Sequence, residues 1–568
     1  MKRALYWTLL ALFDLAALAL CGWLRLPAWA RGGPDRPIYG LTEADARFWP
    51  YGSASDLVLN GPDAGNWAKN AQNFLEGSPL DIYRMPTYTF LVGWMGRRFE
   101  DLAFSGHLVN HLAGVALAPV VYLFGKGPAG RGAALGAAML TAVAPILVNT
   151  QKLYGVDPTL QLALLTLFAA AWWVSRGPWW LAPLAGVAAG IAASTHYLGL
   201  LFPVPLLVLV ALGQRRWGRL LAPLLMGLSA YLTFRWMFHL YPPLGLSQIA
   251  STYAEGVAAS QADVGVSQST LGSAISFVRE RLPGASLMVV QRALGTASKT
   301  GAPWSALVLL FWVGLLAPMS LRPGASLPVP RSPRDALRFI AAWNWLPSLW
   351  FLTLLAPIAL MLAARAPDRY GLYAEPLYLL VLFRGLAALC ALPDAGLARL
   401  WGRWPKGLLA IALCAGLAYR GLAPLQSLWP GLMPIGEGLQ DRAAGALVRE
   451  NFPQSAGRHD AIVTLSQNLP FYADRQRCPN QPCAEGVENV PRCASQILQQ
   501  CRGSGDLPYV VETKAQHGFA DRPSEAMDQA VAARFEKVGA VGDSLRTLTL
   551  YRVPRSELVA IAASMELE

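Results

Sequence analysis

The sequence predicts an all-α polytopic membrane bundle of about eleven spans, followed by a small extracytoplasmic α/β domain. Hydrophobic residues make up 54% of the 568 residues and charged residues only 14%, whereas a charged fraction of about 25% is usual for soluble domains. Long apolar runs recur up to about residue 430, and the remaining segment is polar. This composition excludes a single soluble globular enzyme and a disordered chain.

A transmembrane helix needs about 20 mostly apolar residues. The expected spans lie near 4–24, 103–124, 131–149, 157–175, 179–196, 198–213, 219–238, 304–321, 343–364, 370–391 and 407–427. Residues 1–430 therefore form the membrane domain, with long outer loops at about 25–102 and 239–303. The second loop has few large apolar side chains, and we expect it to be mobile without ligand.

Basic residues set the direction of these spans. Lys2 and Arg3 favour a cytoplasmic N-terminus, and every loop expected inside is basic. An odd number of spans then places the C-terminal domain outside. Asp14, inside the first span, should face the bundle. A cleaved signal peptide ending near Ala28-Trp29-Ala30 is the alternative for that span.

The tail, residues 431–568, reads as a small α/β domain. Strands are expected at Ala461–Leu465, Tyr509–Thr513 and Leu545–Val553, with an amphipathic helix at Ser524–Phe535. One polar segment gathers four cysteines, and an even, local set favours disulfides in an oxidising compartment. These are Cys478, Cys483, Cys493 and Cys501. They could instead bind zinc, but they lack the paired spacing of zinc ribbons.

No Walker loop, dinucleotide fingerprint, HExxH or G-x-S-x-G motif occurs. The first outer loop is more informative. Asp63 stands just before a predicted helix at 65–76, and Arg84-Met85-Pro86 follows. From spacing alone, Asp63 could simply cap that helix, because Asp is a favoured N-cap residue.

The order of these features resembles the GT-C glycosyltransferases, in particular the bacterial branch that includes the protein mannosyltransferase-like and lipid A aminoarabinose transferase-like enzymes. Three later stretches fit the same order, namely Val156-Asp157-Pro158, Thr195-His196-Tyr197 and Arg369-Tyr370. There are two departures. Ala64 follows Asp63 where many relatives have an acidic pair, and His196 stands where a basic residue is common.

The resemblance implies a role for each of these positions. Asp63 would be the base that takes the proton of the acceptor, and Asp157 would orient the acceptor or bind a metal. Arg84 and Arg369 would bind the phosphate of the donor, with His196 and Tyr370 beside them. The sequence leaves a divalent metal possible without requiring one.

Each role has a structural alternative. Arg84 and Arg369 could be interfacial anchors, Asp157 could start a helix, and His196 could be a hydrogen-bonded histidine of the bundle. Glu375 could be an acid behind the site or a cap of a broken turn. Glu43 or Asp45, in the same outer loop, could take the place of Asp63.

The resemblance implies an integral glycosyltransferase of the bacterial inner membrane, a hexosyl- or pentosyltransferase. It would move a sugar from a polyprenyl-phosphate donor to an extracytoplasmic glycan, lipid or protein and invert the anomeric centre. The alternatives are a polytopic transporter or flippase for a lipid-linked substrate, or a non-catalytic scaffold. The few ionisable residues in the spans argue against an ion-coupled transporter. The sugar, the acceptor and the oligomeric state stay open.

Overall fold

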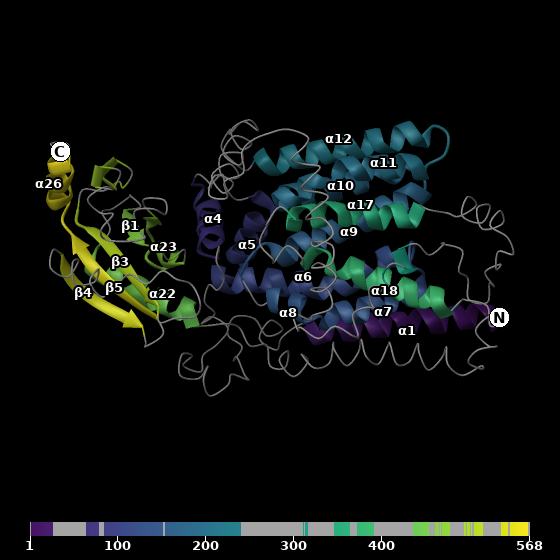
Figure 1. Ribbon diagram of the computed structural model, residues 1–568, viewed down its shortest axis with the longest axis horizontal. Helices are drawn as coiled ribbons and strands as arrows, with labels where there is room; N and C mark the ends of the chain where they lie inside the picture. The colour runs from purple at the N-terminus through teal and green to yellow at the C-terminus, as the bar shows by residue number, and fades with distance from the viewer. Residues whose placement is uncertain are drawn as a thin grey trace.

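The computed structural model shows a helical bundle and a C-terminal sheet domain lying end to end (Figure 1). It describes residues 2–25, 64–78, 85–151, 154–239, 311, 313–315, 346–363, 372–390, 436–453, 460–464, 466, 468–477, 494–495, 497–499, 501, 505–514, 535–542 and 546–565. The N-terminus lies at the end of the bundle farthest from the sheet. We call the opposite end of the bundle its sheet-proximal end.

Most described helices of the bundle lie at predicted spans, whereas α4 (Ala64–Glu76) and α5 (Pro86–Phe99) lie in the segment predicted as the first outer loop, about 25–102. The described helices are α1 (Lys2–Arg25), α4, α5, α6 (Leu102–Gly125), α7 (Arg131–Val143), α8 (Pro145–Gln151), α9 (Asp157–Arg176), α10 (Ala182–Thr195), α11 (Pro203–Gly213), α12 (Gly218–His239), α17 (Leu346–Ala363) and α18 (Glu375–Cys390), with short 3-10 turns η2 (Trp179–Leu181) and η3 (Tyr197–Leu201). Among them, α6, α9 and α12 are long and apolar enough to cross a membrane. The predicted spans near 304–321 and 407–427 and the outer loop at 240–303 lie wholly or largely outside the described residues.

One predicted span does not form a continuous helix in the structure. The run 131–149 is broken at Ala144, where α7 ends in an extended conformation with ψ of 122° before Pro145 opens α8. A proline disfavours the helical conformation of the residue before it and cannot donate a backbone hydrogen bond. The chain therefore starts a second, short helix.

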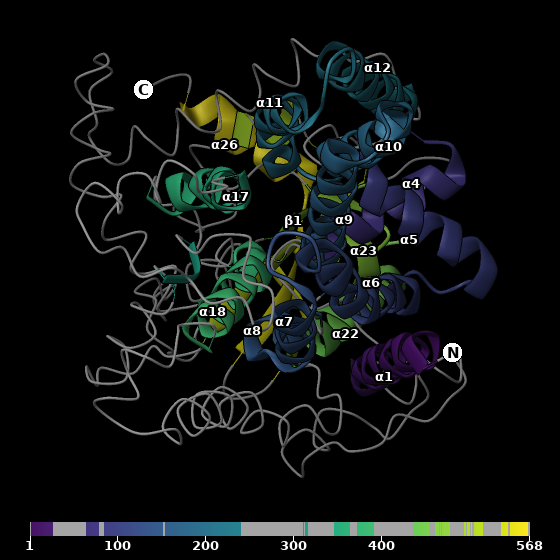
Figure 2. The ribbon, with the colours of Figure 1, turned by 90° about the vertical axis from the view of Figure 1, so that its right-hand side faces the viewer.

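The bundle is built around α9, which packs between α6 and α10 (Figure 2). Its buried aromatic side chains meet those of neighbouring helices, as in Phe168 against Phe202 and Trp172 against Trp350. By contrast, α12 exposes a row of large apolar side chains that includes Leu220, Leu224 and Trp236. An apolar outer face of this kind fits a helix that faces lipid.

Asp14 faces the bundle, as predicted. It is buried, accepts a hydrogen bond from the Tyr122 hydroxyl, and lies 2.7 Å from Nε of Arg131. Further along α1, Arg25 donates from Nε to Oε1 of Gln151 at 2.7 Å, and the Gln151 amide donates back to the Arg25 carbonyl at 2.8 Å. These buried polar bonds fix α1 against α6, α7 and α8.

The C-terminal domain is a five-stranded mixed sheet in the order β2-β1-β3-β5-β4. Its strands are β1 (Ala461–Thr464), β2 (Gln476–Arg477), β3 (Leu507–Lys514), β4 (Glu536–Gly542) and β5 (Arg546–Val553). β1 runs parallel to β2 and β3, whereas β5 is antiparallel to β3 and β4. The predicted strands match β1, β3 and β5, while all of the predicted helix Ser524–Phe535 except Phe535 lies outside the described residues.

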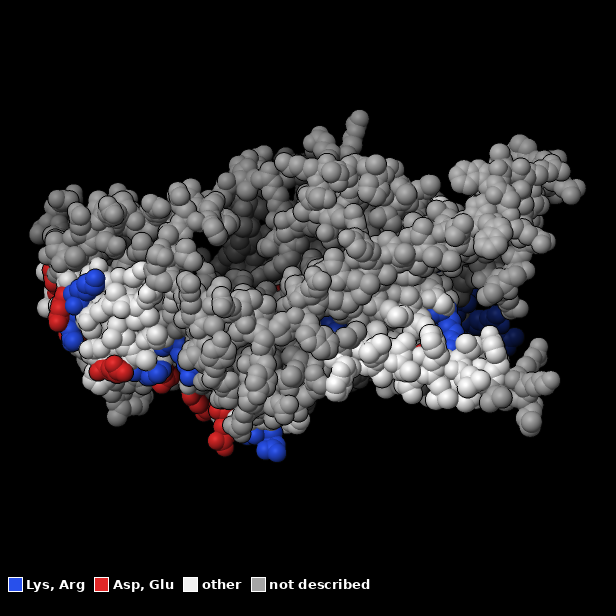
Figure 3. Space-filling model, turned by 90° about the horizontal axis from the view of Figure 1, so that it is seen from below, with Lys and Arg blue, Asp and Glu red and all other residues white. Residues whose placement is uncertain are grey.

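Helices cover both faces of this sheet because alternate strand residues point to opposite sides. Tyr509 of β3 packs towards Leu558 of α26 (Arg555–Met565), and Val510 packs towards Val448 of α22 (Gly436–Asn451). On the face shown in Figure 3, acidic and basic side chains mix on the described part of this domain, whereas the described part of the bundle is mostly uncharged apart from some Lys and Arg near its far end. This contrast matches a polar domain attached to a membrane bundle.

Candidate functional site

Buried aromatic residues from three helices and a loop meet at the sheet-proximal end of the bundle. We call this set the aromatic cluster: Trp67 of α4, Tyr88 of α5, His107 of α6, and Tyr154 before α9. The ring centroids lie 5.2 Å apart for Trp67 and Tyr88, 6.2 Å for Tyr88 and Tyr154, and 5.5 Å for His107 and Tyr154, all edge-to-face. This geometry is favourable for aromatic pairs and fixes the four elements against one another.

A glycine makes the closest approach in this cluster possible. A Cβ atom at Gly106 of α6 would lie 2.1 Å from the ring of Tyr154. The hydroxyl groups of both tyrosines donate to backbone carbonyls, Tyr88 to Gly106 at 3.5 Å and Tyr154 to Leu102 at 3.3 Å. Burial raises the pKa of both Tyr88 and Tyr154, so that both hydroxyls stay protonated donors.

Asp157 is held by a tyrosine that is distant in the sequence. The hydroxyl of Tyr373 donates to Oδ1 of Asp157 at 2.5 Å. One turn further along α9, the Gln161 amide donates to the Leu372 carbonyl at 2.7 Å. Asp157 is also the first residue of α9, where the helix dipole favours an ionised carboxylate. The structure therefore gives it both a helix-starting position and an oriented side chain.

Glu375 lies two residues beyond Tyr373 and opens α18. Its side chain is buried, and its Oε2 has no hydrogen-bond partner among the described residues. A buried carboxyl group without a partner is costly. Glu375 is therefore a buried polar group, two residues from the Tyr373 that holds Asp157, whose burial lowers stability.

His196 has a local structural role. Its Nδ1 accepts a hydrogen bond from the backbone N–H of Leu198 at 3.2 Å, which caps η3 at the end of α10. The neighbouring α10 residue Ser194 shares a hydrogen bond of 2.8 Å with Thr87 of α5. The predicted contact of His196 with a donor phosphate stays a prediction.

Several predicted site residues lie outside the described residues. They are Asp63, Arg84, Arg369 and Tyr370, the alternative acids Glu43 and Asp45, and three of the four tail cysteines, Cys478, Cys483 and Cys493. Cys501 is disulfide-bonded and buried. Ala64 and Met85, which follow Asp63 and Arg84 in the chain, are both buried at the sheet-proximal end.

The C-terminal domain contacts α4 through residues 468–474, which include the short helix α23 (Leu469–Tyr472) and which we call the docking segment. Oδ1 of Asn468 accepts the backbone N–H of Gly65 at 2.8 Å. Asp474 lies 3.4 Å from Nζ of Lys69. Tyr472 packs into the hydrophobic core that contains the aromatic cluster. Figure 1 shows α23 on the side of the domain nearest α4.

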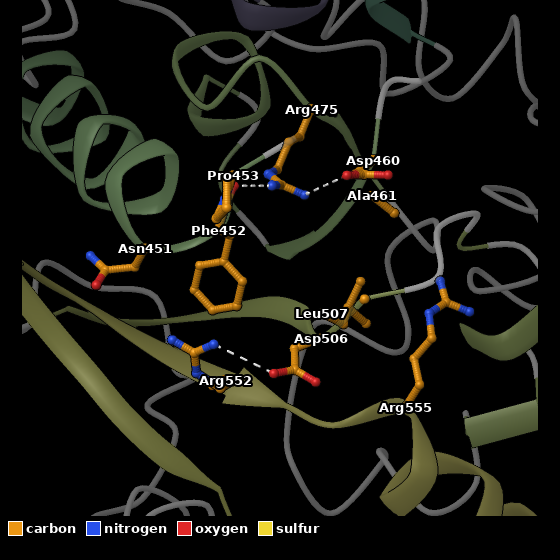
Figure 4. Close-up of a pocket in the computed structure, with 11 residues that line it drawn as sticks. Asn451, Phe452, Pro453, Asp460, Ala461, Arg475, Asp506, Leu507, Arg552 and Arg555 are labelled. Atoms are coloured by element: carbon orange, nitrogen blue, oxygen red, sulfur yellow. Dashed lines mark hydrogen bonds and ion pairs between the residues drawn. The ribbon is translucent and has the colours of Figure 1, made fainter. Parts of the chain in front are cut away.

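The sheet domain holds the docking segment firmly. Arg449 of α22 donates to the Tyr472 carbonyl. Just after the segment, buried Arg475 donates to the Phe452 carbonyl and lies 3.9 Å from Asp460 (Figure 4). Burial lowers the pKa of Arg475, and the charges of Asp460 and Asp474 act in the opposite direction. These bonds fix the segment to α22 and β1.

A cavity of about 400 Å³ lies between the bundle and the C-terminal domain. Its lining combines aromatic rings with charged and amide groups from α4, the start of α6, α22 and the docking segment: Gln72, Glu100, Asp101, Leu102, Ala103, Arg442, Arg449, Phe471, Tyr472 and Asp474. Within the described part of the chain, no three His, Cys, Asp or Glu residues gather as a metal-binding group.

Comparison with known proteins supports this reading of the fold. The family described as dolichyl-phosphate-mannose-protein mannosyltransferase matches residues 85–238. No curated protein sequence matches the chain. ArnT from Cupriavidus metallidurans, in a structure bound to undecaprenyl phosphate, is similar with a TM-score of 0.53 and 14% identity, over 96% of this chain and 98% of that one.

An oligosaccharyltransferase from Archaeoglobus fulgidus is also similar. Its structure tethered with an acceptor peptide has a TM-score of 0.51 at 13% identity. The match covers 84% of this chain and 65% of that one. In complex with an inhibitory peptide and a dolichol-phosphate, it gives 0.50 at 12% identity, over 88% of this chain and 69% of that one. The chain thus spans about two thirds of the archaeal enzyme.

The matched segment and the structural neighbours agree on one class of protein. The resemblance to the GT-C superfamily of membrane glycosyltransferases is confirmed, and the chain has the GT-C fold. The structure of ArnT matches it over nearly the whole length of both chains. It is a multi-pass membrane protein.

Proposed function

We propose that this protein is a glycosyltransferase that moves one sugar from a polyprenyl-phosphate carrier to an extracytoplasmic acceptor, with inversion of the anomeric centre. The observation that carries the proposal is the Asp157–Tyr373 pair beside the aromatic cluster, at the bundle end that contacts the C-terminal domain. An oriented carboxylate in a buried aromatic corner suits a reaction in which an acceptor hydroxyl must be positioned. The similarity of the fold to known glycosyltransferases supports the proposal that this corner binds the substrates of a transferase.

The reaction in this scheme is a single displacement. An oxygen of the acceptor forms a bond to the anomeric carbon, and the bond between that carbon and the phosphate oxygen breaks. The electron pair leaves with the polyprenyl phosphate, and the acceptor proton passes to a carboxylate. Asp63 is our candidate for that base, because it directly precedes α4, whose first residue is buried at this end of the bundle.

The remaining roles follow from charge. The leaving phosphate needs cations, for which Arg84 and Arg369 are the candidates, with His196 and Tyr370 beside them. Asp157 orients the acceptor, and Tyr373 keeps its carboxylate in one position. Where α4 and the docking segment meet, the C-terminal domain closes this side of the bundle.

The test uses purified protein in lipid nanodiscs with polyprenyl-phosphate-linked pentoses and hexoses, together with cell-envelope glycan and lipid fractions as acceptors. We expect one donor class to give a glycosidic product and free polyprenyl phosphate, and NMR of the product to show the opposite anomer. Movement of lipid-linked sugar across proteoliposomes without any new glycosidic bond would favour a flippase instead.

A further inference from the structure

The first turn of α4 is completed by a side chain from the C-terminal domain. An α-helix leaves its first backbone N–H groups without partners inside the helix, and a side chain at the N-cap position usually accepts the bond from the second or third helical residue. In this protein the N–H of Gly65, the second residue of α4, donates to Asn468 at 2.8 Å. The partners are separated by 403 positions in the chain, and the bond is buried.

Asn468 is itself well fixed. Its side chain is buried, and its backbone N–H donates to the Ser466 hydroxyl at 3.3 Å. The same hydroxyl accepts from the N–H of Leu469 and donates to Asp441 of α22 at 2.8 Å. The accepting oxygen is therefore presented to α4 from a rigid support rather than from a freely rotating side chain.

Two further contacts align the same helix. Asp474 interacts with both Lys69 and Gln72 of α4, at 3.4 and 3.3 Å. Tyr472 packs into the core that contains Trp67. The docking segment thus contacts α4 from Gly65 to Gln72, about two turns, so that the position of the helix depends on the sheet domain.

This arrangement bears on the residue before the helix. Asp63 directly precedes Ala64, and a carboxylate at position 63 would otherwise be the natural acceptor for the N–H of Gly65. Because Asn468 accepts that bond, a carboxylate at position 63 is not needed for it. The positive end of the α4 dipole still favours an ionised acid there.

We propose that Asn468 is a positioning residue for the transfer reaction: by completing the first turn of α4 from the C-terminal domain, it orients the helix that directly follows the proposed base Asp63 in the chain. This inference rests on the proposed function. It makes the C-terminal domain part of the active site rather than an appended module.

The experiment compares Asn468→Ala, Asn468→Asp and the control Asn451→Ala in nanodiscs. The amide of Asn451 donates to the Leu447 carbonyl of its own helix, α22, at 2.9 Å. We expect Asn468→Ala to lower kcat by about 2- to 30-fold at a nearly constant KM for the donor, which is the range that loss of a helix cap predicts. Asn468→Asp keeps an accepting oxygen and should recover most of the rate, and the control should match wild type.

The pH profile separates positioning from folding. A frayed first turn stabilises the ionised base less, so the acidic limb of kcat/KM should move to higher pH in Asn468→Ala. An activity loss that only follows the folded fraction, with an unmoved profile, would overturn the inference. If Asn468→Ala does not fold, Asn468→Gln displaces the amide by one methylene and carries the same test.

The two levels of proposal fail differently. If wild-type protein forms no glycosidic bond with any donor, the proposed function fails. If wild type transfers sugar and Asn468→Ala behaves like Asn451→Ala, only the role of Asn468 is overturned.

Discussion

Replacing Tyr373 with phenylalanine removes one hydroxyl group and leaves the ring. In the structure that hydroxyl donates to Oδ1 of Asp157 at 2.5 Å. A hydrogen bond to a charged group contributes about 1.5–3 kcal/mol, and each 1.36 kcal/mol changes a rate by about tenfold. If the bond orients Asp157 in the transition state, Tyr373→Phe should lower kcat by about 10- to 150-fold.

The assay measures initial rates of sugar transfer at several donor and acceptor concentrations. The matched control is Tyr378→Phe, because Tyr378 is a buried tyrosine one turn into α18 whose ring packs against Phe311. A double-mutant cycle with Asp157→Asn isolates the pairwise coupling. Equal kcat values for Tyr373→Phe and Tyr378→Phe, or additive effects in the cycle, would refute the orienting role of Tyr373.

Three further predictions concern stability and the tail. Asp14→Ala should lower the free energy of unfolding by about 1–3 kcal/mol, since it removes a buried partner of Arg131, which is itself partly exposed; an unchanged melting temperature in detergent would contradict this. Gly106→Ala should cost about 1–3 kcal/mol by overpacking, because the new Cβ would lie 2.1 Å from a buried tyrosine ring. Gly132→Ala is its control, since nothing lies within 4 Å of that Cβ, and equal melting temperatures of the two variants would count against the argument. In intact spheroplasts, Cys501 should resist a thiol reagent until reductant is added, and immediate labelling would show a free thiol.

The sequence predicted the helical bundle well because apolar runs of span length and basic loops are strong, local signals. Helix α4 was predicted to within one residue, and three of the strands were located from their β-branched and alternating patterns. The break at Ala144 was missed although Pro145 was visible, because hydropathy alone does not register the backbone restriction that a proline imposes.

The contacts of the candidate site were harder to predict. Tyr88 and Tyr154 lie close in sequence to Arg84 and Asp157, but their burial depends on packing between helices. Tyr373 reaches Asp157 across 216 positions, and Asn468 reaches Gly65 across 403. A single hydrogen bond between distant segments leaves no periodic pattern in one sequence. The prolines and glycines around these residues were the available signal, and they mark turns rather than partners.

The most direct test of the account is sugar transfer by Asp63→Asn in nanodiscs, measured beside wild type with the same polyprenyl-phosphate donor. The asparagine keeps the shape and the hydrogen-bonding capacity of the side chain but cannot accept the proton. We predict that turnover falls by about 100-fold or more, while expression, the melting temperature and donor binding stay near wild type. Because asparagine caps a helix about as well as aspartate, near-normal transfer by Asp63→Asn would leave only a capping role for Asp63 and contradict the proposed mechanism.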